Sequence, residues 1–165
     1  MKAFVVALAL GGLAGCAHAP VALESPAQVD AALTLEPAGP IPRGRLQGKV
    51  VLVAFFATWC FPCIAELPLL ERLQRENEAE GFTVVAVGMD LEGRKVLRPF
   101  VESYALPYPV LIANDALRAG ASVFGPVRAL PTYFLLDRHG SVLLAYQGVA
   151  DPAKLLKRVH DAVRE

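Results

Sequence analysis

The sequence has no excess charge of either sign, because 16 lysine and arginine residues are balanced by 16 aspartate and glutamate residues. A protein without a net field has little to attract nucleic acid or an anionic membrane surface, so we expect no nucleic-acid partner. The chain also lacks an internal repeat, a long charge run and the roughly 20 consecutive apolar residues that a membrane-spanning helix needs. Its 165 residues therefore predict one folded domain with a short leader.

Cysteine is scarce, and the three that are present cannot all pair with one another, so one of them needs a separate explanation. Cys16 closes an apolar leader, whereas Cys60 and Cys63 stand together with two residues between them. A structural zinc site would need four ligands, and no histidine lies near that pair in the sequence. We therefore expect no metal and no cofactor.

The leader has the form of an export signal. Lys2 supplies a minimal positive charge, and residues 3–13 form an apolar run of signal-peptide length. The four residues that end with Cys16 resemble the bacterial lipoprotein signal, in which cleavage precedes a cysteine that becomes acylated. This resemblance implies a signal peptide over residues 1–15 and a lipid anchor on Cys16, at the periplasmic side of the inner or outer membrane. An ordinary signal peptide with an incidental cysteine is the alternative.

Proline is frequent between residues 17 and 48, which prevents regular helix over most of this stretch. We interpret residues 16–30 as a semi-rigid tether and residues 31–165 as the folded domain. Residues 31–36 are expected to form a short strand before a proline-containing turn.

Residues 50–56 form a continuous apolar run, which is typical of a strand buried on both faces. Residues 60–80 carry apolar side chains at helical spacing and end before a glycine, which predicts an amphipathic helix that Pro68 should kink. Similar patterns predict strands at 83–88, 110–113, 132–136 and 142–146, and helices at 95–104, 116–124 and 152–163. Alternating strands and helices imply parallel pairing, and the closing hairpin adds an antiparallel edge. The predicted fold is α/β, a mixed sheet flanked by helices.

The cysteine pair lies where the central strand ends and a helix begins. Free N–H groups and the helix dipole stabilise a thiolate there, so we expect Cys60 to be the nucleophile. Pro62 suits the first helical turn, which does not use the missing N–H. Cys60 would attack a substrate disulfide, and the more buried Cys63 would then release the substrate thiol. Run backwards, the same steps oxidise a dithiol.

Residues 48–63 resemble the thioredoxin superfamily, and more narrowly its exported reductases of the TlpA/ResA type. Residues 129–132 resemble the stretch that carries the cis-proline of that family. The resemblance covers the chain from residue 31 onward. It implies a thioredoxin-like fold with an inserted αβ unit and an N-terminal extension, and thiol–disulfide oxidoreductase activity. Phe56 and Phe61 depart from the family pattern, and Phe61 bears on redox potential and substrate preference.

The resemblance also implies roles for residues near the pair. Glu66 matches a glutamate beneath the active site, which would accept the Cys63 proton during resolution; a solvated helix glutamate is the alternative. A cis Leu130–Pro131 bond would face the cysteines, with Leu130 offering backbone hydrogen bonds to substrate, whereas an edge-strand proline is the simpler interpretation.

The remaining motif residues are expected to shape the surface on which a substrate docks. Trp59 would be partly exposed beside Cys60, with a purely core role as the alternative, and Phe61 and Pro62 would complete the surface. The absence of histidine between the cysteines favours reduction over oxidation. The resemblance implies exported protein disulfides or dithiols as partners, apocytochrome c among them, with electrons supplied by a membrane thiol donor.

Three other functions are compatible with a cysteine at a helix start. Peroxiredoxin-type thiol peroxidases place a proline and a threonine before their cysteine, where this chain has Val53 and Ala57. Metal-binding modules of this fold have a wider cysteine spacing and a later histidine, and a c-type haem site needs histidine where this chain has Ile64. A disulfide used only as a staple would close a loop too short to constrain much unfolded chain.

Overall fold

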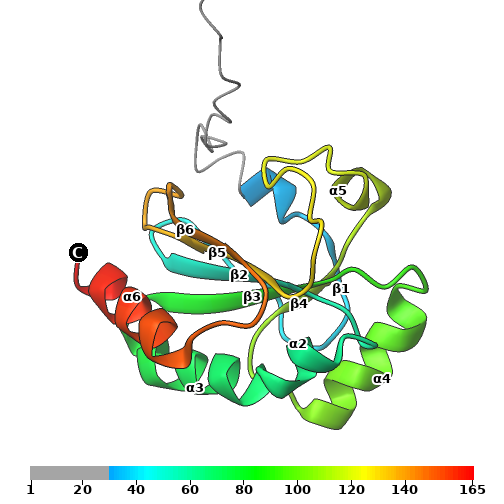
Figure 1. Cartoon of the computed structure of the whole chain (residues 1–165), viewed down its shortest axis with the longest axis horizontal. Helices are drawn as coiled ribbons and strands as arrows, with labels where there is room; N and C mark the ends of the chain where they lie inside the picture. The colour runs from blue at the N-terminus through cyan, green and yellow to red at the C-terminus, as the bar shows by residue number, and fades with distance from the viewer. Residues whose placement is uncertain (1–29) are drawn as a thin grey trace, which may run out of the picture.

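The computed structural model describes residues 30–165, so the predicted signal peptide, Cys16 and nearly all of the tether lie outside the described residues. A six-stranded sheet with the order β1-β4-β3-β2-β5-β6 forms the centre of the domain (Figure 1). Its strands are β1 (Glu36–Pro37), β2 (Val50–Phe56), β3 (Phe82–Gly88), β4 (Val110–Ile112), β5 (Thr132–Leu136) and β6 (Val142–Gln147). The helices are α2 (Phe61–Ala65), α3 (Leu67–Asn77), η1 (Glu78–Glu80), α4 (Arg94–Tyr104), α5 (Asp115–Arg118) and α6 (Pro152–Arg164).

The central strand is β2, as its apolar run predicts, and every one of its residues is buried. Alternate side chains point to opposite faces of a strand. Val50, Leu52 and Ala54 accordingly join the core beneath the long helices. Val51, Val53 and Phe55 join a second core on the other face. The two cores together hold β2 in one register, because a slip by one residue would exchange its two faces.

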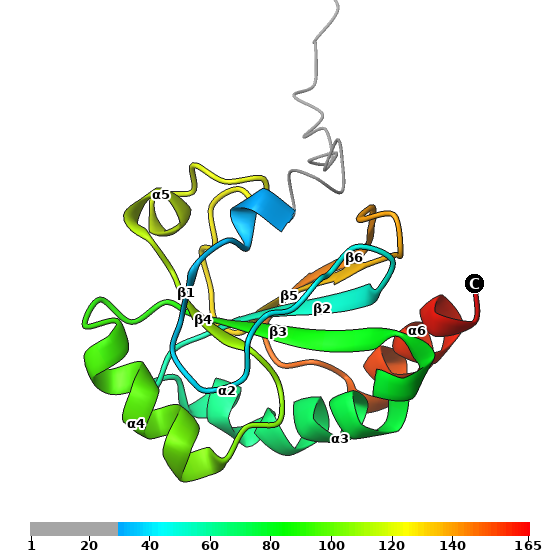
Figure 2. The same cartoon turned by 180° about the vertical axis from the view of Figure 1, so that it is seen from behind.

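Helices cover both faces of the sheet unequally (Figures 1 and 2). The helices α2, α3, α4 and α6 lie on one side, whereas α5 and the helical turn at residues 30–32 lie on the other. Strands β2, β3 and β4 run parallel, and β5, β6 and β1 pair antiparallel with their neighbours. This arrangement confirms the predicted mixed sheet of the thioredoxin-like fold.

Two predicted elements are wrong in extent. Residues 30–32 are helical, and Glu36 is the one residue of the expected strand at 31–36 that pairs with the sheet; together with Pro37 it forms β1 at the sheet edge. Proline has no N–H to donate to a ladder, which suits an edge position and a short strand. The helix expected over residues 116–124 ends at Arg118, two residues before Gly120, whose φ of +78° breaks helical geometry.

The long helix predicted after the cysteines is divided into α2 and α3 at Glu66. Pro68 lies in the first turn of α3, where its missing N–H costs nothing, so the expected kink is a helix boundary. Gly81 then ends the segment with a φ of +83°. Among residues 30–165, no helix combines the length and the apolar character needed to cross a membrane.

Candidate active site around the Cys60–Cys63 disulfide

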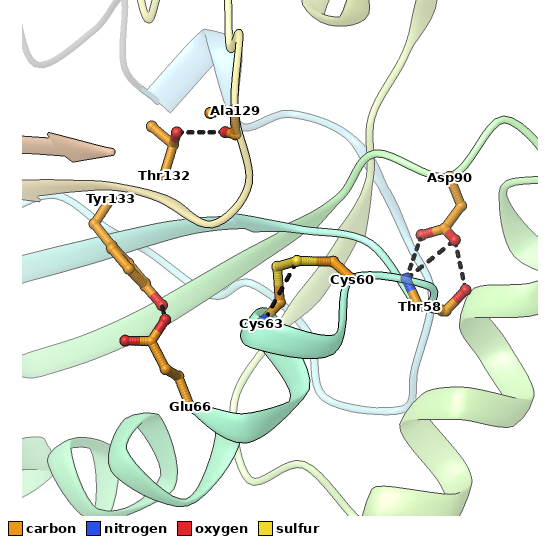
Figure 3. The surroundings of a disulfide bond; sticks show 8 residues. All are labelled: Thr58, Cys60, Cys63, Glu66, Asp90, Ala129, Thr132 and Tyr133. Carbon is orange, nitrogen blue, oxygen red and sulfur yellow. Dashed lines mark hydrogen bonds between the residues drawn. A yellow bond between two sulfur atoms is a disulfide. The ribbon is translucent and has the colours of Figure 1, made fainter. Parts of the chain in front are cut away.

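Cys60 and Cys63 form a disulfide at the start of α2, directly beyond the end of β2 (Figure 3). Cys60 is the N-cap of the helix, and its Sγ accepts the N–H of Cys63 at 3.3 Å. The turn that leads into it is closed by the Cys60 N–H, which donates to the Ala57 carbonyl at 3.0 Å. A sulfur that accepts a helical N–H at this position is placed where negative charge is stabilised.

The two cysteines differ little in exposure, at 5% for Cys60 and 3% for Cys63. The residues on either side of Cys60 are much more exposed than the cysteines, at 71% for Trp59 and 79% for Phe61. The partly exposed position expected for Trp59 is therefore confirmed, and its core alternative is excluded. Two large apolar side chains in water beside a reactive pair are typical of a surface that another molecule covers.

A groove passes over Cys60 and contains every residue of the predicted docking surface except Pro131. The residues that line it are Trp59, Cys60, Phe61, Pro62, Met89, Val127, Arg128, Ala129 and Leu130. The Leu130–Pro131 peptide bond is cis, as the resemblance implies. Arg128 is the only charged residue of the lining. Sequence reasoning missed it, although it directly precedes the stretch that contains the cis-proline.

Glu66 is buried at the junction of α2 and α3, so the alternative of a solvated glutamate is wrong. The Tyr133 hydroxyl donates to its Oε2 at 2.7 Å, and the Ala150 N–H donates to its Oε1 at 2.6 Å. Figure 3 shows the carboxylate turned toward Tyr133. Both oxygens thus have a donor, which satisfies a buried polar group. Tyr133 lies on the face of β5 that packs against these helices.

Burial alters the acidity of two tyrosines on this side of the sheet. It raises the pKa of Tyr133 well above its ordinary value, and the hydrogen bond to Glu66 raises it further. Burial likewise raises the pKa of Tyr108, with a smaller contribution from the charge of Glu71. Within residues 30–165 the Tyr108 hydroxyl has no hydrogen-bond partner. Both hydroxyls therefore stay protonated in the folded protein at alkaline pH.

A buried acid that the sequence did not single out lies beside the site. Asp90 is 1% exposed, and its carboxylate accepts the backbone N–H and the hydroxyl of Thr58, two residues before Cys60. The sequence could have indicated Asp90, because it follows the end of β3 closely, just as Cys60 follows the end of β2. Within the described part of the chain, no three histidine, cysteine, aspartate or glutamate side chains gather as metal ligands would.

Comparison with known proteins places this geometry in a family. Residues 28–145 match the AhpC/TSA family, which is more than half of the chain. The chain belongs to the AhpC/TSA family. Several relatives of the chain are named as thiol–disulfide oxidoreductases, a name that suits a protein with a Cys60–Cys63 disulfide.

Two relatives from bacteria illustrate the similarity. The chain is 38% identical to the thioredoxin-like protein YneN of Bacillus subtilis over 98 residues, which are 58% of this chain and 55% of that protein. It is 36% identical to the thiol–disulfide oxidoreductase ResA of Bacillus cereus over 98 residues, 59% of this chain and 54% of that protein. The match therefore spans about half the length of these curated relatives.

Solved structures support the same fold. A thioredoxin-family thiol:disulfide interchange protein from Chlorobium tepidum is 30% identical with a TM-score of 0.63, over 72% of this chain and 82% of that one. A secreted thiol–disulfide isomerase from Corynebacterium glutamicum is 25% identical with a TM-score of 0.64, over 72% and 73%. The expected resemblance to exported proteins of the ResA type is confirmed.

Removal of the hydroxyl should affect stability differently at the two buried tyrosines. Tyr133→Phe leaves one oxygen of the buried Glu66 carboxylate without its donor and should lower the free energy of unfolding by about 1–3 kcal/mol at pH 7. Tyr108→Phe removes a hydroxyl with no partner in the described residues, so stability should be equal or higher. Urea unfolding followed by circular dichroism measures both.

The raised pKa values of Tyr108 and Tyr133 also predict how the stability of the protein changes at alkaline pH. An unfolded tyrosine ionises near pH 10, whereas the raised pKa keeps Tyr108 and Tyr133 protonated in the fold, so the unfolded state binds fewer protons above pH 10. Wild-type stability should therefore fall as pH rises above about 10, and each Phe variant should lose less between pH 9 and 11. Equal losses in all three proteins would contradict this account.

Proposed function

We propose that the protein is a thiol–disulfide oxidoreductase that reduces disulfides of exported proteins. The observation that carries the proposal is the position of Cys60, which caps α2, accepts the Cys63 N–H and borders the groove that also contains Leu130. In the reduced protein the Cys60 thiolate attacks a substrate disulfide, forms a mixed disulfide and displaces one substrate thiolate. Cys63 then attacks the Cys60 sulfur, which releases the second substrate thiolate and leaves the Cys60–Cys63 disulfide.

Two electrons pass to the substrate in each cycle, so a donor must reduce the protein again. We assign this task to a membrane thiol donor, in line with the expected export of the chain. The absence of histidine between the cysteines supports the reducing direction. Similarity to proteins named ResA, and the family resemblance, make apocytochrome c a candidate among the substrates.

The other functions receive less support from the same residues. Ala57 and Val53, which stand where peroxiredoxins have threonine and proline, are both fully buried and offer no hydroxyl near Cys60. A metal-binding module would need ligands beyond the cysteine pair. Metal binding is a separate outcome of the experiment below.

A Cys63→Ser variant should trap the substrate, because Cys60 can still attack but the mixed disulfide is no longer resolved. In the native host it should yield covalent adducts that disappear on reduction, separated by non-reducing electrophoresis and identified by mass spectrometry. Cys60→Ser is the matched control and should yield none. The proposal fails if Cys63→Ser captures no exported protein, and metal that co-purifies with the wild type would favour the metal-binding alternative.

We also propose that Glu66 accepts the Cys63 proton when the mixed disulfide is resolved. Its burial and its position one turn after Cys63 support this role. Glu66→Gln keeps the side-chain shape and should slow the decay of a preformed mixed disulfide by at least about tenfold. Rapid acid quenching and gel analysis measure the decay, with the exposed Glu76→Gln on α3 as control. An unchanged decay would make Glu66 a structural residue.

Export and lipid anchoring are proposed from the sequence around Cys16. The wild type should incorporate an alkyne-tagged palmitate in cells and partition into detergent, and Cys16→Ser should do neither. Cys60→Ser is the control, because it tests whether the label is attached at Cys60 instead of Cys16. This variant should incorporate the lipid as the wild type does. Equal labelling of Cys16→Ser and wild type would refute the anchor.

A further inference from the structure

Thr58 and Asp90 occupy matching positions beyond two neighbouring parallel strands. The register pairs Phe56 at the end of β2 with Gly88 at the end of β3. The ladder continues for one more hydrogen bond, from the Met89 N–H to the Phe56 carbonyl at 2.8 Å. Each of the two residues then follows its strand by two positions, so the fold brings them together beside Cys60.

Their contact consists of three hydrogen bonds, which we call the Thr58–Asp90 clasp (Figure 3). The Thr58 N–H donates to both carboxylate oxygens of Asp90, each at 3.1 Å. The Thr58 hydroxyl donates to Oδ1 at 2.6 Å. A backbone donor and a side-chain donor from one residue thus converge on one carboxylate, which restrains both the position and the rotation of Thr58.

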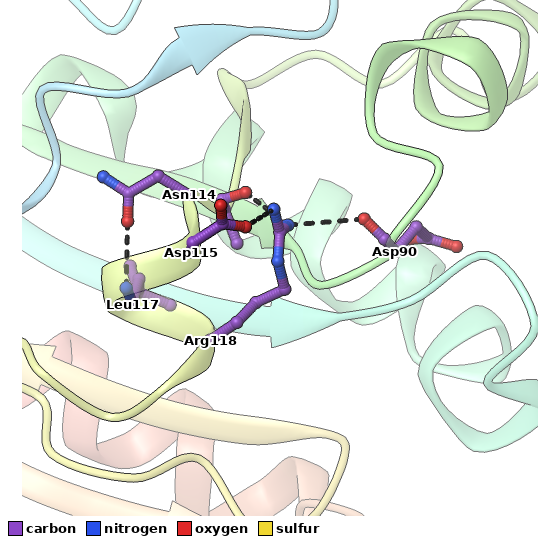
Figure 4. A network of polar contacts seen from close by, with 6 residues as sticks. Asp90, Asn114, Asp115, Leu117 and Arg118 are labelled. Carbon is purple, nitrogen blue, oxygen red and sulfur yellow. Dashed lines mark hydrogen bonds and ion pairs between the residues drawn. The ribbon is translucent and has the colours of Figure 1, made fainter.

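The acid itself is anchored from the opposite side through its backbone (Figure 4). The Asp90 carbonyl accepts an N–H of Arg118 at 3.4 Å and the Gly93 N–H at 3.2 Å. Arg118 also donates to the Ala113 carbonyl and pairs with Asp115 at 3.0 Å. The anchor therefore connects Asp90 to α5 and to Ala113, the residue that follows β4.

The carboxylate has no counter-ion within residues 30–165, and its hydrogen-bond partners there are all on Thr58. A buried charge is costly unless it is hydrogen-bonded, and removal of its partners leaves it uncompensated. The clasp is therefore hard to open while Asp90 stays buried.

Thr58 lies in the turn of residues 57–60, which leads from β2 to Cys60. Ala57 before it accepts the Cys60 N–H, and Trp59 after it projects into solvent beside the groove. We propose that Asp90 is a positioning residue that acts through Thr58 to hold this turn, so that Cys60 meets a substrate disulfide in a fixed orientation. The inference rests on the proposed function only for its effect on rate.

The protein has one tryptophan, and it lies within this turn, so its fluorescence reports the clasp directly. Thr58→Val keeps the side-chain shape and the N–H but removes the hydroxyl donor. Asp90→Asn keeps the shape of the acid but removes its charge and replaces one acceptor oxygen with a donor. Thr58→Ser retains the hydroxyl and serves as rescue. Asp115→Asn alters an exposed acid of the same Arg118 network without touching Thr58.

Single-turnover reduction of a small disulfide peptide by the reduced protein gives the rate of Cys60 attack. Thr58→Val and Asp90→Asn should each lower this rate by about tenfold, because a misplaced nucleophile loses its productive orientation. The double variant should be little slower than either single variant, since the clasp acts as one unit. Trp59 anisotropy should fall in both single variants, and Thr58→Ser and Asp115→Asn should match the wild type.

Urea unfolding of each variant separates a positioning role from a merely structural one. If Thr58→Val and Asp90→Asn are folded and less stable but react at the wild-type rate with unchanged anisotropy, the proposal is overturned. Additive rate losses in the double variant, or a Thr58→Ser protein as slow as Thr58→Val, would also overturn it. A wild type that does not reduce the peptide would refute the proposed function instead, while anisotropy would still test the clasp.

Discussion

The parallel pairing of β2 with β3 is the constraint on which the site depends. Both strands are buried throughout, and their register is held by two separate cores, one on each face of the sheet. The carboxyl ends of parallel strands lie at the same edge of a sheet, where functional sites of α/β folds commonly form. Cys60 follows the carboxyl end of β2 and Asp90 follows that of β3, so both lie at this edge. The two cores thus determine where the Cys60–Cys63 pair lies, because they fix the register of β2 and β3.

Two buried carboxylates flank the disulfide, and each is hydrogen-bonded to a different part of the fold. Glu66 joins the α2–α3 junction to Tyr133 on β5 and to the backbone at Ala150, after β6. Asp90 joins the loop after β3 to Thr58 in the turn before Cys60. Polar groups in a low-dielectric interior tolerate little displacement. The turn before Cys60 and the junction after α2 are therefore each held by a buried carboxylate.

Family membership and fold are shared by proteins of several activities, so the argument for function rests on the site. Here the site offers a disulfide at a helix start, a cis-proline and a groove with apolar walls and a single charged residue, Arg128. These features support the proposal that the substrate is a polypeptide with a disulfide. Under the proposed function, the exposed Trp59 and Phe61 provide apolar contact area for a substrate beside Cys60.

The sequence alone was sufficient for the central strand, the order of most elements and the reactive pair, because hydrophobic period and the Cys60–Cys63 spacing are local signals. Resemblance added the cis bond before Pro131 and the position of Glu66. The short extent of β1 and α5 was missed, since helix and strand ends depend on what the segment packs against. The strand pattern places Asp90 just after β3, but nothing near Asp90 or Tyr133 in the chain identifies Thr58 and Glu66 as their hydrogen-bond partners. Only tertiary structure decided those pairings, because they join residues 32 and 67 positions apart.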